Sequence, residues 1–152
     1  MRIRERKTRR ERRLDAEAEA RGKALVGMVD SAMIMACADG ELTTDEIGVV
    51  AGVIDGFFDG QLNRREIEEL INLSLEAIER DGIEGRLDTL AENLPNDELR
   101  GYALAAAAAV AISDVEGDED EEDETYYDIA DALDISKRDA DAIWDEVVSE
   151  YA

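Results

Sequence analysis

The chain has 152 residues, of which 45% are hydrophobic, with one cysteine, no histidine and a formal net charge of −23. This length and hydrophobic fraction fit one folded domain with a sizeable core, despite the charge. The lack of histidine excludes Ser-His and Cys-His nucleophile pairs and histidine metal sites, and the single Cys37 excludes an intramolecular disulfide. An enzyme would have to use carboxylates, lysines, tyrosines or a hard metal, as a carboxylate-based metal hydrolase does. Because no activated nucleophile or phosphate-binding loop accompanies the acids, we expect a binding protein that is not an enzyme.

The composition also bears on location and source. The longest apolar run, "YALAAAAAVAI" at residues 102–112, is shorter than the roughly 20 residues that span a membrane, and no apolar segment follows the basic N-terminus as in a secretory signal. We expect a cytoplasmic protein, with a position at a membrane surface or in an assembled particle as alternatives. Low lysine content beside 40 acidic residues favours a halophilic source, in which carboxylates retain water and cations.

The chain begins with a basic arm. Residues 1–13, "MRIRERKTRRERR", contain eight basic and two acidic side chains, a net charge of +6. Because the whole chain has a net charge of −23, residues 14–152 have a net charge of −29. The segment that follows is rich in alanine and glutamate and favours helix, with a break expected at Gly22. We therefore divide the chain into an arm, 1–22, partly helical or flexible, and a helical domain, 23–152.

Beyond the arm, apolar residues recur at helical spacing, and abundant alanine with a single proline indicates an all-α fold. Three helix starts carry cap residues, namely Thr43 with Glu46, Asn63 with Glu66, and Ser136. We expect about seven helices, or about eight with the arm, because turn signals occur at intervals along the chain. These signals are Asp39-Gly40, Gly60, Asp81-Gly82, Pro95, the acidic segment 114–124 and the residues before Ser136.

The strongest pattern is a repeated unit of helix, acidic loop and helix. The loops are "CADGELTTDE" at 37–46 and "DVEGDEDEEDE" at 114–124, the second with nine carboxylates in eleven positions. The apolar residues after Glu46 recur at the same intervals after Glu122: Val50, Val53, Ile54 and Phe57 in the first unit, and Tyr126, Ile129, Ala130 and Leu133 in the second. The second loop has one residue more than the first.

Neither loop fits the EF-hand pattern, which alternates acids before a glycine and ends in a bidentate glutamate. Calcium takes six to eight oxygen ligands, so one loop alone is insufficient. Two loops brought together could supply them, and we expect a divalent cation there, calcium before magnesium. The candidate ligands are Asp39, Glu41 and Glu46 from the first loop with Asp114, Glu116, Asp118 and Glu122 from the second.

The segments "MIMACADGELTTDE" and "AAAVAISDVEGDEDEEDETYYDIADALDIS" resemble the two halves of the TerB-like (tellurite resistance B) family. The resemblance covers about residues 24–148, and the arm lies outside it. It implies about seven helices in a pseudo-twofold bundle, clustered acids that bind divalent cations, and a role in tellurite resistance and stress response through protein partners in membrane-linked complexes. Asp39, Glu46, Asp114 and Glu122 match best, and Glu41, Asp45, Glu116, Asp118 and Glu121 match less closely.

Simpler interpretations stay open at this point. Asp39 and Glu46 also fit a turn followed by a helix cap, and most acids of 114–124 fit a solvated surface. The arm fits a contact with nucleic acid, with an anionic membrane, or with an acidic surface of this chain or a neighbour. The alternative function is a structural or assembly protein, viral or particle-associated, that uses the same fold and contacts nucleic acid or a partner subunit through the arm.

Overall fold

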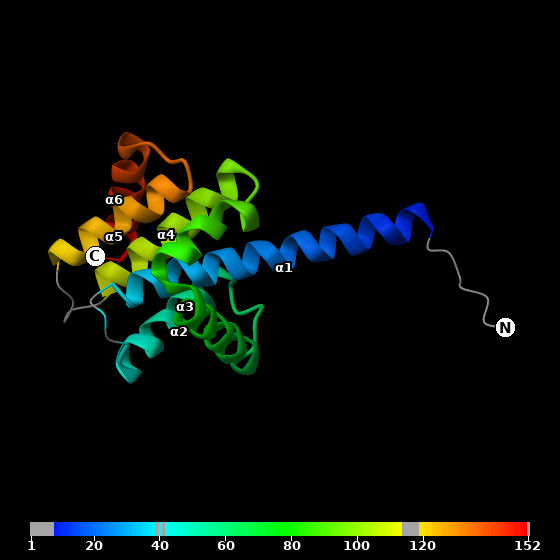
Figure 1. Cartoon of the computed structure of the whole chain (residues 1–152), viewed down its shortest axis with the longest axis horizontal. Helices are drawn as coiled ribbons and strands as arrows, with labels where there is room; N and C mark the ends of the chain where they lie inside the picture. Colours follow the sequence, from blue (N-terminus) through cyan, green and yellow to red (C-terminus); the bar gives the residue numbers. More distant parts are fainter. Residues whose placement is uncertain (1–7, 39, 41, 114–118, 152) are drawn as a thin grey trace.

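A computed structural model of the chain describes residues 8–38, 40, 42–113 and 119–151, the last segment without the side chains of residues 119–121. Every regular element in this part of the chain is an α-helix (Figure 1). The helices are α1 (Arg9–Ala36), α2 (Thr44–Phe57), α3 (Arg64–Asn93), α4 (Asp97–Ser113), α5 (Glu119–Ala132) and α6 (Lys137–Tyr151).

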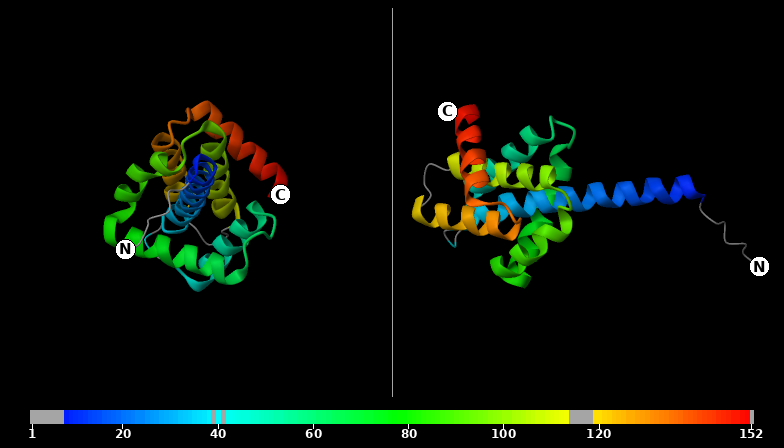
Figure 2. Two further views of the ribbon diagram at one scale, coloured as in Figure 1. Left: turned by 90° about the vertical axis from the view of Figure 1, so that its right-hand side faces the viewer. Right: turned by 90° about the horizontal axis from the view of Figure 1, so that it is seen from above.

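The centre of the fold is the parallel pair of α1 and α4. Gly27 lies against Leu94, just before α4, and further along both helices the Ser31 hydroxyl donates a hydrogen bond of 2.8 Å to the Ala103 carbonyl. Small side chains let the two backbones approach closely, and the alanines of α4 from Ala106 to Ala109 are all buried. The two helices consequently end on the same side of the molecule (Figures 1 and 2).

The other helices surround this pair. α2 and α3 pack on one side of it, and α5 and α6 cover the other side (Figure 1). α2 and α5, which follow the two acidic loops, each contact both α1 and α4. The apolar positions that the sequence repeat matches are buried in both units, apart from the half-buried Phe57.

The helix count differs from the expected one, since the described residues form six helices. α1 continues through Gly22, so the helix expected in the arm and the first helix expected in the domain are one helix. α3 likewise joins two predicted helices, which meet at a kink where Gly82 has φ 76° and ψ 165°. A side chain would be strained at that φ, so glycine allows the turn that the Asp81-Gly82 signal indicated.

Helix starts follow the predicted capping chemistry. The Asn63 amide oxygen accepts a bond of 2.9 Å from the Glu66 backbone N–H, and the Glu66 carboxylate accepts one from the Asn63 backbone N–H. Ser136 caps α6 in the same way, by accepting from the Asp139 backbone N–H. These local bonds satisfy donors that a helix start leaves open, which is why the starts could be placed from sequence.

The first half of α1 projects from the body as a lone helix. Residues 8–23 are all exposed, and burial begins at Ala24 (Figures 1 and 2). Thr8 and Glu11 form a capping box at the helix start. Leu14 on this projecting helix is 48% exposed and does not pack against the hydrophobic core of the body.

A buried ion pair ties α1 to both halves of α3. Asp30 is fully buried, and its two carboxylate oxygens accept from the Ser74 hydroxyl at 2.6 Å and from the Arg86 guanidinium at 2.5 Å. Arg86 also donates to Asp81 at 3.3 Å. Burial lowers the pKa of Arg86, but the hydrogen bond and charge of Asp30, followed by those of Asp81, outweigh it and raise that pKa. Ser74 and Arg86 flank the kink at Gly82, so Asp30 fixes the angle between the two halves.

The contact between Gly27 and Leu94 predicts opposite effects for two alanine substitutions in α1. A Cβ at Gly27 would lie 2.8 Å from Leu94 Cγ, whereas a Cβ at Gly22 meets no atom within 4 Å. We expect Gly27→Ala to lower the free energy of unfolding by about 1–3 kcal/mol and Gly22→Ala to raise it by about 0.5–1 kcal/mol. Urea unfolding of both variants measures this, and an unchanged stability of Gly27→Ala would contradict the close packing.

The Asp30 network predicts a large cost for Arg86→Ala. Removing the cation leaves a carboxylate that is 1% exposed without its counter-charge, so we expect a loss of about 3–5 kcal/mol in the free energy of unfolding. Arg65→Ala is the matched control, because its ion pair with Glu69 is exposed and contributes about 1 kcal/mol or less. Equal losses in the two variants, measured by urea unfolding, would show that the buried pair does not hold the kink.

Candidate functional site

The predicted cation ligands fall into two groups. Asp39, Glu41, Asp114, Glu116 and Asp118 lie outside the described residues. The remaining candidates, Asp45, Glu46 and Glu122, are placed by the structure at the start of the two helices that follow the acidic loops.

Glu46 turns toward the body while its neighbour Asp45 is exposed. The Glu46 backbone N–H donates to the Thr43 hydroxyl oxygen at 3.2 Å, and that hydroxyl donates to Glu46 Oε1 at 3.1 Å. The second carboxylate oxygen, Oε2, is buried. In the capping boxes at Thr8 and Asn63, by contrast, the glutamate accepts from the backbone N–H of the cap residue. Capping therefore engages one face of the Glu46 carboxylate, and the other face points inward.

Glu122 is the counterpart of Glu46 in the second unit, and it is 9% exposed. Asp123 and Glu124, the next residues of α5, are exposed. Four residues after Glu122, Tyr126 is buried in the core and its hydroxyl donates 2.6 Å to the Ala140 carbonyl. Glu122 thus lies on the inward face of α5, on the side of Tyr126.

The two glutamates begin helices at one end of the molecule. The parallel helices α1 and α4 both end there, and α2 and α5 are the helices that follow them in the chain (Figure 1). Among the side chains that the structure describes, no group of three or more acids and thiols is close enough to hold a metal ion. The arrangement therefore brings the starts of α2 and α5, the second helices of the two units, to one end of the molecule. The remaining candidate ligands lie outside the described residues.

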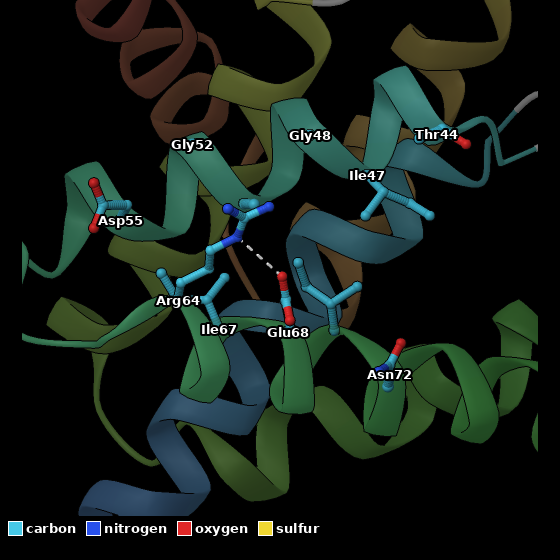
Figure 3. A pocket seen from close by; sticks show the side chains of 11 residues that line it. Thr44, Ile47, Gly48, Gly52, Asp55, Arg64, Ile67, Glu68 and Asn72 are labelled. Carbon is cyan, nitrogen blue, oxygen red and sulfur yellow. Dashed lines mark hydrogen bonds and ion pairs between the residues drawn. The ribbon is translucent and has the colours of Figure 1, made fainter.

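A groove lies between α2 and α3 and has a volume of about 700 Å³ (Figure 3). Its walls contain Ile47, Ile67 and two glycines, Gly48 and Gly52, at which a Cβ would meet no atom within 4 Å. The rim carries charges of both signs, because Arg64 and Glu68 form an ion pair of 3.1 Å across one turn of α3. Asp55 adds a second acid to the lining, and this open groove was not predicted from the sequence.

A second cavity, of about 400 Å³, lies between α5 and α6 and is lined by aromatic and acidic side chains. The rings of Tyr126 and Trp144 meet edge to face at 5.0 Å between centroids, and Tyr127 adds a further edge contact. The Tyr127 hydroxyl donates a short hydrogen bond to Asp141, which raises the pKa of Tyr127 and lowers that of Asp141. Burial raises the pKa of Tyr126 strongly. The hydroxyls therefore act as donors here at neutral pH.

Sequence reasoning overlooked the buried charge on α1. Asp30 lies within the apolar run "VGMVDSAMIMA", where a lone acid on the buried side of a helix was a usable signal. Its partners, Ser74 and Arg86, are 44 and 56 residues away, so no local pattern identifies them. The same holds for Tyr127 and Asp141, which pair across two helices.

No described helix is long and apolar enough to cross a membrane. Comparisons with protein-family models, with curated proteins and with solved structures found no match to this chain. The inward-facing glutamates and the shape of the bundle are therefore the observations on which a function can be proposed.

The Tyr127–Asp141 pair predicts a shift in a titration midpoint. The Tyr127 hydrogen bond stabilises the charged carboxylate, so the pKa of Asp141 lies below its ordinary 3.8. The stability it contributes is present above the unfolded pKa and is lost as pH falls through the folded value. We expect Tyr127→Phe to raise the Asp141 pKa toward 3.8, measured by carboxyl ¹³C NMR. Tyr151→Phe, at an exposed tyrosine, is the control and should leave the midpoint unchanged.

Proposed function

We propose that this chain is a non-enzymatic, divalent-cation-binding interaction module of the TerB-like type. One observation carries the proposal: Glu46 and Glu122, which the sequence repeat pairs, both turn inward, while their neighbours Asp45 and Asp123 face solvent. A carboxylate is costly to withdraw from water, so an inward position at both repeats indicates a shared role rather than general solubility.

The position of the two helix starts supports a bridging site. The Ser31–Ala103 hydrogen bond holds α1 and α4 in register, and the two helices, after which the acidic loops follow, end at the same side of the molecule. Calcium takes carboxylate and carbonyl oxygens in flexible geometry, and magnesium keeps several waters, so a site that draws ligands from two loops favours calcium. Glu46 and Glu122 would be the glutamate ligands, with Asp39, Glu41, Asp114, Glu116 and Asp118 as the loop ligands.

In this function the cation acts as a link between the two units. It offsets repulsion between carboxylates and fastens α2 and α5 to the same end of the α1–α4 pair, so its binding free energy adds to folding. The surface that results is then available to a protein partner only in the cation-bound form. The resemblance implies a role for such a module in tellurite resistance and stress response, in membrane-linked complexes, and we propose a cytoplasmic location.

The cation site predicts a specific rise in the melting temperature. We expect calcium to raise the Tm more than magnesium or potassium chloride at matched ionic strength, because screening alone does not distinguish the salts. The double variant Glu46→Gln with Glu122→Gln should lose this calcium-specific shift. Asp39→Asn with Asp114→Asn should lose it as well, since ligands from both loops are needed.

The matched control removes two carboxylates from the solvent faces of the same helices. Asp55→Asn with Asp128→Asn changes exposed residues of α2 and α5 and should keep the calcium-specific shift. The proposal fails if the wild-type chain shows no difference between calcium and potassium chloride, or if the control loses the shift as completely as the glutamate variant does.

A second candidate function rests on the projecting half of α1. A lone, exposed helix with Arg9, Arg10, Arg12 and Arg13 at its start is suited to contact something outside the chain's own fold. A structural or assembly protein, in which this arm contacts nucleic acid or a partner subunit, would use it directly. The two functions are separable by mutation, because the projecting start of α1 lies at one side of the molecule and the starts of α2 and α5 lie at the other (Figure 1).

A further inference from the structure

An acidic groove with an apolar floor lies on the body of the protein, between α4, α6 and the end of α2. We call it the Tyr102 groove, and it has a volume of about 330 Å³. Its floor contains Phe57, Ala105, Ile143 and Val147, and Tyr102 stands on it with 49% of its surface exposed.

The charge of the Tyr102 groove has a single sign. Four of its lining residues are acids, and no lysine or arginine is among them: Asp97, Glu98, Glu146 and Glu150. The α2–α3 groove, by contrast, carries charges of both signs, since Arg64 lines it together with Glu68 and Asp55. An apolar floor between carboxylates fits a ligand that is apolar along its centre and cationic at its ends.

The projecting half of α1 has this pattern. Arg10, Leu14, Ala18 and Arg21 follow one another at spacings of four, four and three residues, so they lie along one face of the helix. Leu14 and Ala18 form the apolar centre of that face, and an arginine stands at each end. The whole segment 9–23 carries six basic and four acidic side chains, a net charge of +2. All four are exposed, and Leu14 is among the few large hydrophobic side chains exposed on the described chain.

We propose that the projecting helix, residues 9–23 of one copy of the chain, docks in the Tyr102 groove of a second copy. The groove of the same copy is excluded, because α1 is continuous and its residues from Ala24 to Ala36 are packed in the core. A rigid helix that points away from its own body can reach a groove only on another molecule (Figure 2). This contact is independent of the proposed cation site.

Such a contact joins two different surfaces, so it is heterologous. Each copy offers one helix and one groove, and repeated docking closes into a ring or extends into a filament. The helix from residue 9 to 23 is about 22 Å long, which gives a small interface of the weak, transient class. Salt weakens the arginine–carboxylate attraction, so association should decrease as the salt concentration rises.

Two full-length variants test the contact by sedimentation velocity over a range of protein and salt concentrations. The arm variant carries Arg10→Gln, Leu14→Gln and Arg21→Gln, and the groove variant carries Glu98→Gln, Tyr102→Ser and Glu150→Gln. We expect the wild-type chain to self-associate at low salt and each variant alone to associate at least about tenfold more weakly. All six positions are on the surface, and circular dichroism checks that both variants fold.

An equimolar mixture of the two variants gives the sharper result. The groove variant keeps an intact helix and the arm variant keeps an intact groove, so one productive contact remains and the mixture should form dimers and nothing larger. A control variant with Leu73→Gln, Glu79→Gln and Glu92→Gln removes one exposed hydrophobic and two exposed acids from α3, and it should associate like the wild type.

Three results would overturn the proposal. The first is a wild-type chain that stays monomeric at low salt and high concentration. The second is a groove variant that associates as well as the wild type, which would place the helix elsewhere. The third is a monomeric wild type whose binding to duplex DNA is lost in the arm variant, which would assign the helix to nucleic acid.

Discussion

The close approach of α1 and α4 is the constraint on which the remaining structure depends. Two parallel helices pack at short distance only where side chains are small, and here α4 contributes its buried alanines, while Gly27 of α1 leaves room for Leu94 just before α4. The Ser31–Ala103 hydrogen bond then fixes how far one helix has slid along the other. That register decides where α1 and α4 end, and so where both acidic loops leave the helix pair.

The buried Asp30–Arg86 pair adds specificity to this centre. A buried ion pair contributes little net stability compared with apolar residues of the same size, because both charges lose their water. Its effect is on arrangement: Asp30 on α1 contacts Ser74 before the kink of α3 and Arg86 after it. Arg100 acts similarly at the far end of α3, where its guanidinium donates to the Leu94 carbonyl at 2.7 Å and to the Leu133 carbonyl after α5 at 3.3 Å.

Local chemistry was predictable from the sequence, and long-range chemistry was not. Caps at Asn63 and Ser136 and the turn at Gly82 depend on residues a few positions apart, and the structure confirms them. The break expected at Gly22 is wrong, because one glycine costs a helix only about 1 kcal/mol and the flanking residues favour helix strongly. The Asp30 network and the Tyr102 groove join distant segments, so no spacing rule finds them.

The same reasoning applies to the candidate site. The repeat identified Glu46 and Glu122 as equivalent, and the structure turns both inward while Asp45 and Asp123 face solvent. What the repeat could not supply is the distance between the two loops, since that depends on the register of α1 and α4. The cation proposal therefore rests on two things. The sequence repeat identifies the candidate ligands, and the packing of α1 on α4 brings the starts of α2 and α5 to one end of the molecule.

The projecting helix and the body of the protein carry opposite net charges. The projecting helix begins with four arginines, and the body carries the large acidic excess. The central claim is that one cation connects the two acidic units of that body. Anomalous diffraction from crystals grown with manganese tests it most directly, because the ion marks its own position. The account predicts one peak at the end of α1 and α4, with oxygen ligands from both loops. A peak with ligands from one loop alone, or a map without a peak at that end, would contradict it.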